Sequence, residues 1–102
     1  MSTLHTVNKS PFGNGALQSC LKHCKPGDAV LLIEDGVYGA IAGSALAAEV
    51  RAGLSDVALY VLEGDVKARG IDAGKILGEV KSVGYGGFVD LVTSHDRTQA
   101  WL

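Results

Sequence analysis

The stretch AVLLIEDG, residues 29–36, decides the fold class. Its first five residues form an unbroken apolar run, whereas a strand with one exposed face alternates apolar and polar residues. We therefore predict a strand over 29–33 that is covered on both faces, as in the middle of a parallel sheet. The acidic pair and the glycine that follow mark the carboxyl end of this strand, where open α/β sheets form their ligand crevice.

Strands and helices alternate on both sides of this run. On its N-terminal side we predict a strand over 3–7 and a helix over 16–24, which the Lys-Pro-Gly that follows must end. On its C-terminal side we predict, in chain order, a helix over 39–52, a strand over 57–62, an irregular polar segment over 63–71, a short helix over 72–80, a strand over 88–93 and a final strand or sheet edge over 98–102. This alternation predicts an α/β fold, with one small domain over 1–102 and a central, mostly parallel sheet flanked by helices in flavodoxin-like layers.

The composition favours partner proteins over nucleic acid or membrane. Hydrophobic residues make up 47% of the chain. We expect part of this apolar surface to lie in a subunit interface, and a dense core is the alternative. The net charge is −2 and the basic residues of 67–81 alternate with acidic ones, which argues against direct RNA or DNA binding. No signal peptide and no bilayer-length apolar stretch is visible, so a soluble, cytoplasmic protein is expected.

Cys20 and Cys24 offer the most suggestive chemistry. Four residues apart on the predicted helix, they share one face, where their thiols can meet. Lys22 and His23 would lower the pKa of a nearby thiol if they leaned toward it, and a thiolate can hold sulfane sulfur as a persulfide. The alternative is simple packing, because both cysteines lie on the apolar stripe of the helix. Of the two, Cys20 is the better candidate sulfur acceptor, because it lies in the middle of the helix.

Other candidate sites have weaker support in the sequence. Two thiols and His23 lack a fourth ligand for a metal, and His5 and His95 would join them only if the fold brought them close, so we expect no metal site. The acidic pair 34–35 either positions a ligand or caps the element that follows it. The glycines of 36–43 match neither a dinucleotide fingerprint nor a P-loop, and no cofactor is expected.

Four segments, in the right order, resemble the DsrH/TusB family. They are HTVNKSPF at 5–12, DAVLLIEDGVY at 28–38, YVLEGDVKARG at 60–70, and YGGFVDL at 85–91 with Trp101 behind it. Together these segments span nearly the whole chain. Because it has Cys20, the chain resembles the DsrH branch of the family more closely, and that branch belongs to sulfur-oxidising bacteria.

This resemblance implies a fold, partners and a pathway. Family members have a compact α/β fold and assemble with sister subunits of the DsrE/TusD and DsrF/TusC types, as a hexamer with two copies of each. The complex passes persulfide sulfur through cysteines, together with a small carrier of the DsrC/TusE type. In TusB-like systems the sulfur ends in the 2-thiouridine of transfer RNA, and in DsrH-like systems it belongs to the oxidation of stored sulfur.

The resemblance also limits what this chain does by itself. The principal sulfur-carrying cysteine of the complex is on the DsrE/TusD subunit. The chain is therefore expected to be a non-principal subunit of a sulfurtransferase complex, with Cys20 as a second acceptor or with a role in shaping the assembly. Two alternatives remain open: a free-standing thiol or persulfide carrier, and a small ligand-binding α/β module.

Overall fold

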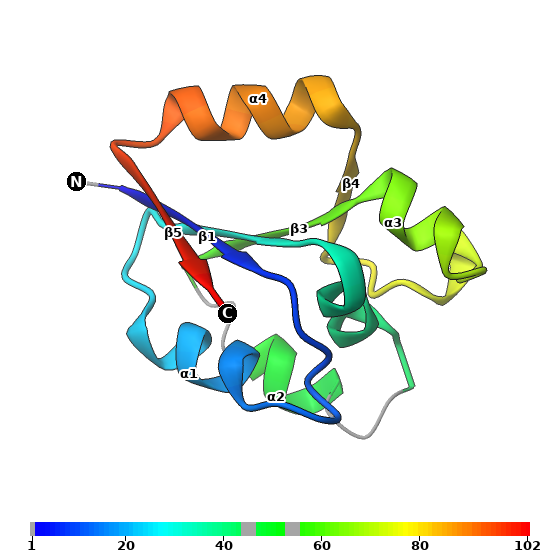
Figure 1. Cartoon of the computed structure of the whole chain (residues 1–102). Coiled ribbons are helices and arrows are strands. Elements are labelled where there is room, and N and C mark those ends of the chain that lie inside the picture. Colours follow the sequence, from blue (N-terminus) through cyan, green and yellow to red (C-terminus); the bar gives the residue numbers. More distant parts are fainter. Residues whose placement is uncertain (1, 44–46, 53–55) are drawn as a thin grey trace.

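Five parallel strands form one sheet in the computed structural model, which describes residues 2–43, 47–52 and 56–102 (Figure 1). The strands are β1 (Thr3–Val7), β2 (Ala29–Leu32), β3 (Ala58–Leu62), β4 (Lys81–Val83) and β5 (Arg97–Trp101). Their order is β4-β3-β2-β1-β5, and every neighbouring pair is parallel. The predicted α/β fold with a central parallel sheet is confirmed.

Strands β1 and β2 lie in the interior of the sheet, and β2, at its centre, is apolar throughout. Every residue of β1 and β2 is buried, because helices cover both faces of the sheet there. The strands predicted over 3–7, 29–33 and 57–62 are confirmed to within a residue. So is the final edge strand, since β5 pairs only with β1 and is largely exposed.

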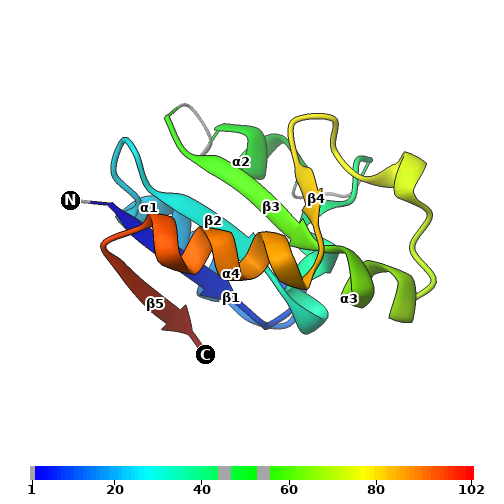
Figure 2. The same ribbon diagram turned by 90° about the horizontal axis from the view of Figure 1, so that it is seen from above.

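The helices cover the two faces of the sheet unequally. Helices α1 (Ala16–His23) and α2 (Ala47–Ala52) lie on one face, and α4 (Tyr85–Ser94) lies alone across the other (Figures 1 and 2). Helix α3 (Glu63–Ala68) follows β3 directly, and two short 3₁₀ helices, η1 (Glu34–Ala40) and η2 (Ala73–Lys75), are the remaining helical elements of the described residues. No helix in the described segments is long and apolar enough to cross a membrane.

The strand predicted over 88–93 is wrong, because these residues lie within α4. Valine and threonine favour strands locally, but here the apolar positions also fit a helical period. Phe88 and Leu91, three residues apart, both pack against the sheet. Burial of that helical face outweighs the β propensity of the single residues.

The predicted helix over 39–52 is also wrong in its first part. Gly39 and Ala40 belong to η1, and Ile41 then forms an isolated antiparallel bridge with Ile76. The close approach of η1 to the sheet depends on Gly36, where a Cβ would overlap the carbonyl oxygen of Val7. Residues 47–52 are helical, as α2, and 44–46 lie outside the described residues.

The segment between β3 and α4 differs from its prediction as well. Residues 63–71 were expected to be irregular, yet 63–68 form α3, which the Lys67 to Glu63 ion pair supports at 2.9 Å. The short helix predicted over 72–80 is reduced to η2, whose Asp72 side chain caps Gly74. Strand β4 at 81–83 was not predicted, because three partly exposed residues carry no apolar pattern.

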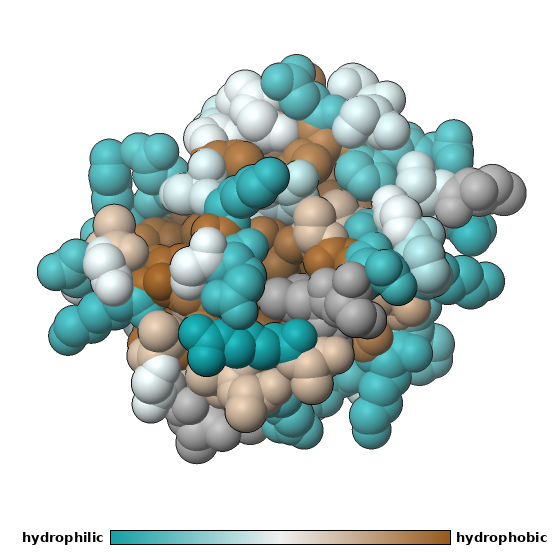
Figure 3. Space-filling view, turned by 180° about the vertical axis from the view of Figure 1, so that it is seen from behind, coloured by the Kyte–Doolittle hydropathy of each residue, from teal (hydrophilic) through white to brown (hydrophobic). Residues whose placement is uncertain are grey.

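The two faces of the sheet bury different amounts of apolar surface. The larger cluster, on the α1 and α2 side, includes Cys20, Val30, Leu32 and Val61. The smaller cluster under α4 consists of Leu4, Ala29, Leu31 and Leu91, with partly buried neighbours. Apolar side chains also reach the surface across the middle of the molecule as seen from behind (Figure 3).

Candidate functional site: a thiol pair beside a buried histidine

Helix α1 brings the two cysteines together. Asn14 accepts a hydrogen bond from the backbone of Ala16 at 2.8 Å where the helix starts, and the helix ends at Cys24, whose N–H donates to the carbonyl of Cys20 at 3.1 Å. Cys20 is fully buried in the larger core, whereas Cys24 is partly exposed and packs against the edge of that core. Their sulfur atoms lie within 4.8 Å of each other.

The two thiols are close enough to interact, and this interaction separates their acidities. The pKa of Cys20 is raised, first because its S–H bonds to Cys24 and then because it is buried. The pKa of Cys24 is lowered by the same hydrogen bond, against the effects of burial and of the negative charge on Asp28. Cys20 is therefore the hydrogen-bond donor of the pair, and Cys24 is the thiol that ionises first.

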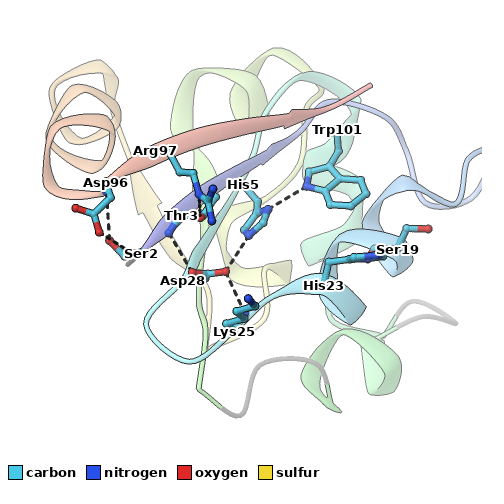
Figure 4. A network of polar contacts seen from close by, with 10 residues as sticks. All are labelled: Ser2, Thr3, His5, Ser19, His23, Lys25, Asp28, Asp96, Arg97 and Trp101. Carbon is cyan, nitrogen blue, oxygen red and sulfur yellow. Dashed lines mark hydrogen bonds and ion pairs between the residues drawn. The ribbon is translucent and has the colours of Figure 1, made fainter.

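A buried histidine, His5, lies beside the pair. It connects β1 with β5 and with the residue that precedes β2 (Figure 4). The indole N–H of Trp101 on β5 donates to Nδ1 of His5 on β1 at 3.0 Å. The opposite ring nitrogen, Nε2, lies 3.0 Å from Oδ2 of Asp28, which directly precedes β2. Because an indole can only donate, Nδ1 carries no proton, and His5 is the neutral tautomer with its proton on Nε2.

Asp28 anchors this arrangement. Its carboxylate accepts hydrogen bonds from the backbone of Thr3 at 3.0 Å and of Lys25 at 3.1 Å, in addition to that from His5. Burial raises the pKa of Asp28, but the bonds from His5, Lys25 and Thr3 lower it more, and the net direction is down. The carboxylate therefore holds the start of β1, the turn before β2 and the His5 ring in one geometry.

Donor atoms of His5, Cys20 and Cys24 lie within 4.8 Å of one another, the kind of grouping that can hold a metal ion. The fold thus brings His5 to the thiols, while Nδ1 of His95 is engaged with the carbonyl of Leu91 at 2.7 Å. Both ring nitrogens of His5 are already used, by Trp101 and by Asp28. The arrangement therefore fits thiol chemistry better than metal ligation.

Lys22 and His23, the basic residues between the two cysteines in the sequence, are engaged in other contacts. Nδ1 of His23 donates to the carbonyl of Ser19 at 2.7 Å, and its ring centre lies 5.5 Å from that of Trp101. Lys22 lines an apolar groove between α1 and α2. The lowered pKa of Cys24 therefore has Cys20 as its source, and not Lys22 or His23.

A polar cavity of about 470 Å³ opens on the same side of the sheet. Its walls include His5 and Asp28, together with His23, Lys25, Arg97 and Trp101. No sequence pattern indicated Asp28 or Trp101 as site residues, and His5 was predicted only as a possible metal ligand. The pairing of β1 with both β2 and β5 assembles them, and no local pattern in the sequence reports that pairing.

The acidic pair after β2 is tied to α3. Glu34 adopts a positive φ of 50°, and its backbone N–H donates to Asp65 at 2.7 Å. Asp35 accepts from Arg69 at 2.9 Å and caps no helix, so the capping interpretation is wrong. These contacts fix the loop at the carboxyl end of β2.

Comparisons with known proteins show the family of the chain. The model of the family described as "DsrH like protein" matches residues 9–98. Among curated relatives, Protein TusB of Pectobacterium parmentieri is 38% identical, and Protein TusB of Klebsiella pneumoniae (strain 342) is 39% identical. Each alignment covers 96% of this chain and 99% of the relative.

Solved structures show the same fold at low identity. The ychN protein from E. coli superposes with a TM-score of 0.77 at 15% identity, covering 98% of this chain and 99% of that one. A protein of unknown function from Methanobacterium thermoautotrophicum gives 0.73 at 17% identity, covering 91% and 92%. These likenesses establish the fold alone, whereas the family model and the curated relatives show that the chain belongs to the DsrH/TusB family.

Proposed function

We propose that this chain is a non-principal subunit of a cytoplasmic sulfurtransferase complex that relays persulfide sulfur between cysteines. Its partners are sister subunits of the DsrE/TusD and DsrF/TusC types, two copies of each with two of this chain, and a carrier of the DsrC/TusE type. The likeness to TusB proteins supports delivery of the sulfur to the 2-thiouridine of transfer RNA. Sulfur oxidation, as in DsrH-like systems, is the alternative destination.

The observation that carries this proposal is the Cys20–Cys24 pair, whose sulfur atoms lie within 4.8 Å of each other, in a chain of this family. A persulfide relay needs a thiolate that a partner can approach, with a neighbouring group that stabilises it. The pair supplies both, and Cys20, the acceptor candidate from the sequence, is one of its two members. The principal sulfur-carrying cysteine is on a sister subunit.

Helix α4 supplies a surface for the sister subunits. Tyr85, Val89 and Val92 are 80%, 57% and 40% exposed. Spaced four and three residues apart, they form one stripe along the outer face of α4. A sister subunit of the same fold would bury this stripe, and the apolar content of the chain is then consistent with its small core.

Native mass spectrometry of the assembly tests the proposal. A tagged chain is purified gently from its own cells, and we expect a mass that requires two related small chains in equal number with this one. Cys20→Ser should leave this assembly intact, because serine has nearly the same volume. A homodimer or a monomer would contradict the proposal and favour a free-standing thiol carrier.

A further inference from the structure

The two thiols of the pair differ in their access to a partner. Cys20 lies in the middle of α1, fully buried among the residues of the larger core. Cys24 ends the helix, has extended backbone and is partly exposed. Of the two residues, the partly exposed Cys24 is therefore the one that an incoming persulfide on another protein can approach without opening the core.

We propose that Cys24 is the thiol of this chain that takes up sulfane sulfur, and that Cys20 is a positioning residue that stabilises the Cys24 thiolate by donating its S–H. This inference rests on the proposed relay of persulfide sulfur. The position of Cys20 in the middle of the helix favoured it as the sulfur acceptor, and this inference assigns that role to Cys24 instead.

The other ionisable groups near Cys24 do not perform this task. His5, from β1, donates its Nε2–H to Asp28 and accepts from Trp101 at Nδ1, so it has no free nitrogen to serve as a base. Asp28 opposes the thiolate through its negative charge. The S–H of Cys20 is the contact that favours the ionised form of Cys24.

The transfer step balances without an oxidant. The Cys24 thiolate attacks the terminal sulfur of a partner's persulfide, R–S–SH, and forms a new S–S bond to that sulfur. The S–S bond of the partner breaks, and its electron pair leaves with R–S⁻, so that Cys24 becomes Cys24–S–SH and no net redox change occurs. Because Cys20 stays protonated, it does not attack the new S–S bond and expel hydrosulfide, and the persulfide survives for the next acceptor.

The pH profile of alkylation tests the role of Cys20 independently of sulfur. The full chain in its purified assembly is treated with iodoacetamide, and peptide mass spectrometry follows each cysteine. We expect Cys24 to react first, and Cys20→Ala to move its midpoint up by about one pH unit, with alkylation about tenfold slower below that midpoint. Cys20→Ser keeps a donor and should restore most of the wild-type profile. An unchanged midpoint in Cys20→Ala, or faster alkylation of Cys20, would overturn the inference.

Loading with glutathione persulfide then locates the sulfur. The expected result is one additional sulfur atom on the Cys24 peptide, lost in Cys24→Ser and reduced in Cys20→Ala. Sulfur on Cys20 alone, or on a sister subunit with neither thiol of this chain loaded, overturns the inference but leaves the proposed relay standing. An assembly that takes up no sulfur on any chain overturns the proposed function and the inference together.

Discussion

The two faces of the sheet differ both in the apolar surface they bury and in the polar groups they carry. The face under α1 and α2 carries the larger core, the thiol pair and the chain of hydrogen bonds from Asp28 through His5 to Trp101. The face under α4 carries a thin apolar cluster and one helix whose outer side is itself apolar. One face is therefore complete within the chain and holds the thiol pair, whereas the other leaves an exposed apolar stripe on the outside of α4.

The largest expected effect concerns the anchor of the first face. Asp28→Ala removes one carboxylate and leaves the N–H groups of Thr3, Lys25 and His5 without their acceptor. We expect a loss of about 4 kcal/mol in the free energy of unfolding, measured by urea denaturation. Asp90→Ala, an exposed change on α4, is the control and should stay within about 0.5 kcal/mol.

The same carboxylate predicts a pH dependence. The folded-state pKa of Asp28 is lowered, so its contribution is fully present above its unfolded pKa of about 3.9 and is lost as the pH falls through the lower, folded value. Wild type should therefore lose stability below about pH 4 more steeply than Asp28→Asn does. Parallel acid-unfolding curves for the two proteins would show that Asp28 contributes nothing to the pH dependence.

A matched pair of substitutions compares the two cores directly. Leu31 and Leu32 are neighbours in β2, both fully buried, and they face α4 and α1 respectively. We expect Leu32→Ala to cost about 4 kcal/mol and Leu31→Ala about 3, because α4 has no second layer behind it and can move inward to fill the gap. Equal losses in urea denaturation would mean that the α4 layer is as rigid as the other.

The substitution with the smallest effect on the stability of the isolated chain should have the largest effect on assembly. Val89→Ser on the outer stripe of α4 should change the stability of the free chain by less than about 0.5 kcal/mol. It should nevertheless weaken association with the sister subunits, seen as their loss during gentle purification. Phe12→Ser is the control, since Phe12 is also 57% exposed but lies outside α4. Loss of the sister subunits from both variants alike would argue against a specific role for α4.

The sequence predicted the elements that a local pattern defines. The runs at 29–33 and 57–62 are strands because continuous apolar residues suit the middle of a parallel sheet, and the strand at 3–7 was indicated by its β-branched residues. The same reasoning failed for the segment 88–93, because its valines and threonine favour a strand. Its buried and exposed helical faces can be recognised only when the sheet on which it packs is known. Tertiary packing decided that element.

The candidate site was predictable only in part. Two thiols on one helical face follow from the spacing of Cys20 and Cys24, and their proximity is confirmed. Their unequal burial depends on how the end of α1 packs against the sheet, and this packing cannot be inferred from the spacing of the cysteines. The contribution of His5, Asp28 and Trp101 comes from three strands separated by most of the chain.

The pairing of β5 with β1 also determines which contacts of the sheet form last during synthesis of the chain. Thr3 pairs with Arg97, and Val7 with Trp101, so the first strand gains its second neighbour only after residues 97–101 have left the ribosome. Until then one edge of β1 keeps its N–H and C=O groups unpaired, the state in which strands join foreign partners. The indole that fixes the His5 tautomer arrives with the same strand. A nascent chain therefore completes the pairing of its first strand and fixes the His5 tautomer in one late step.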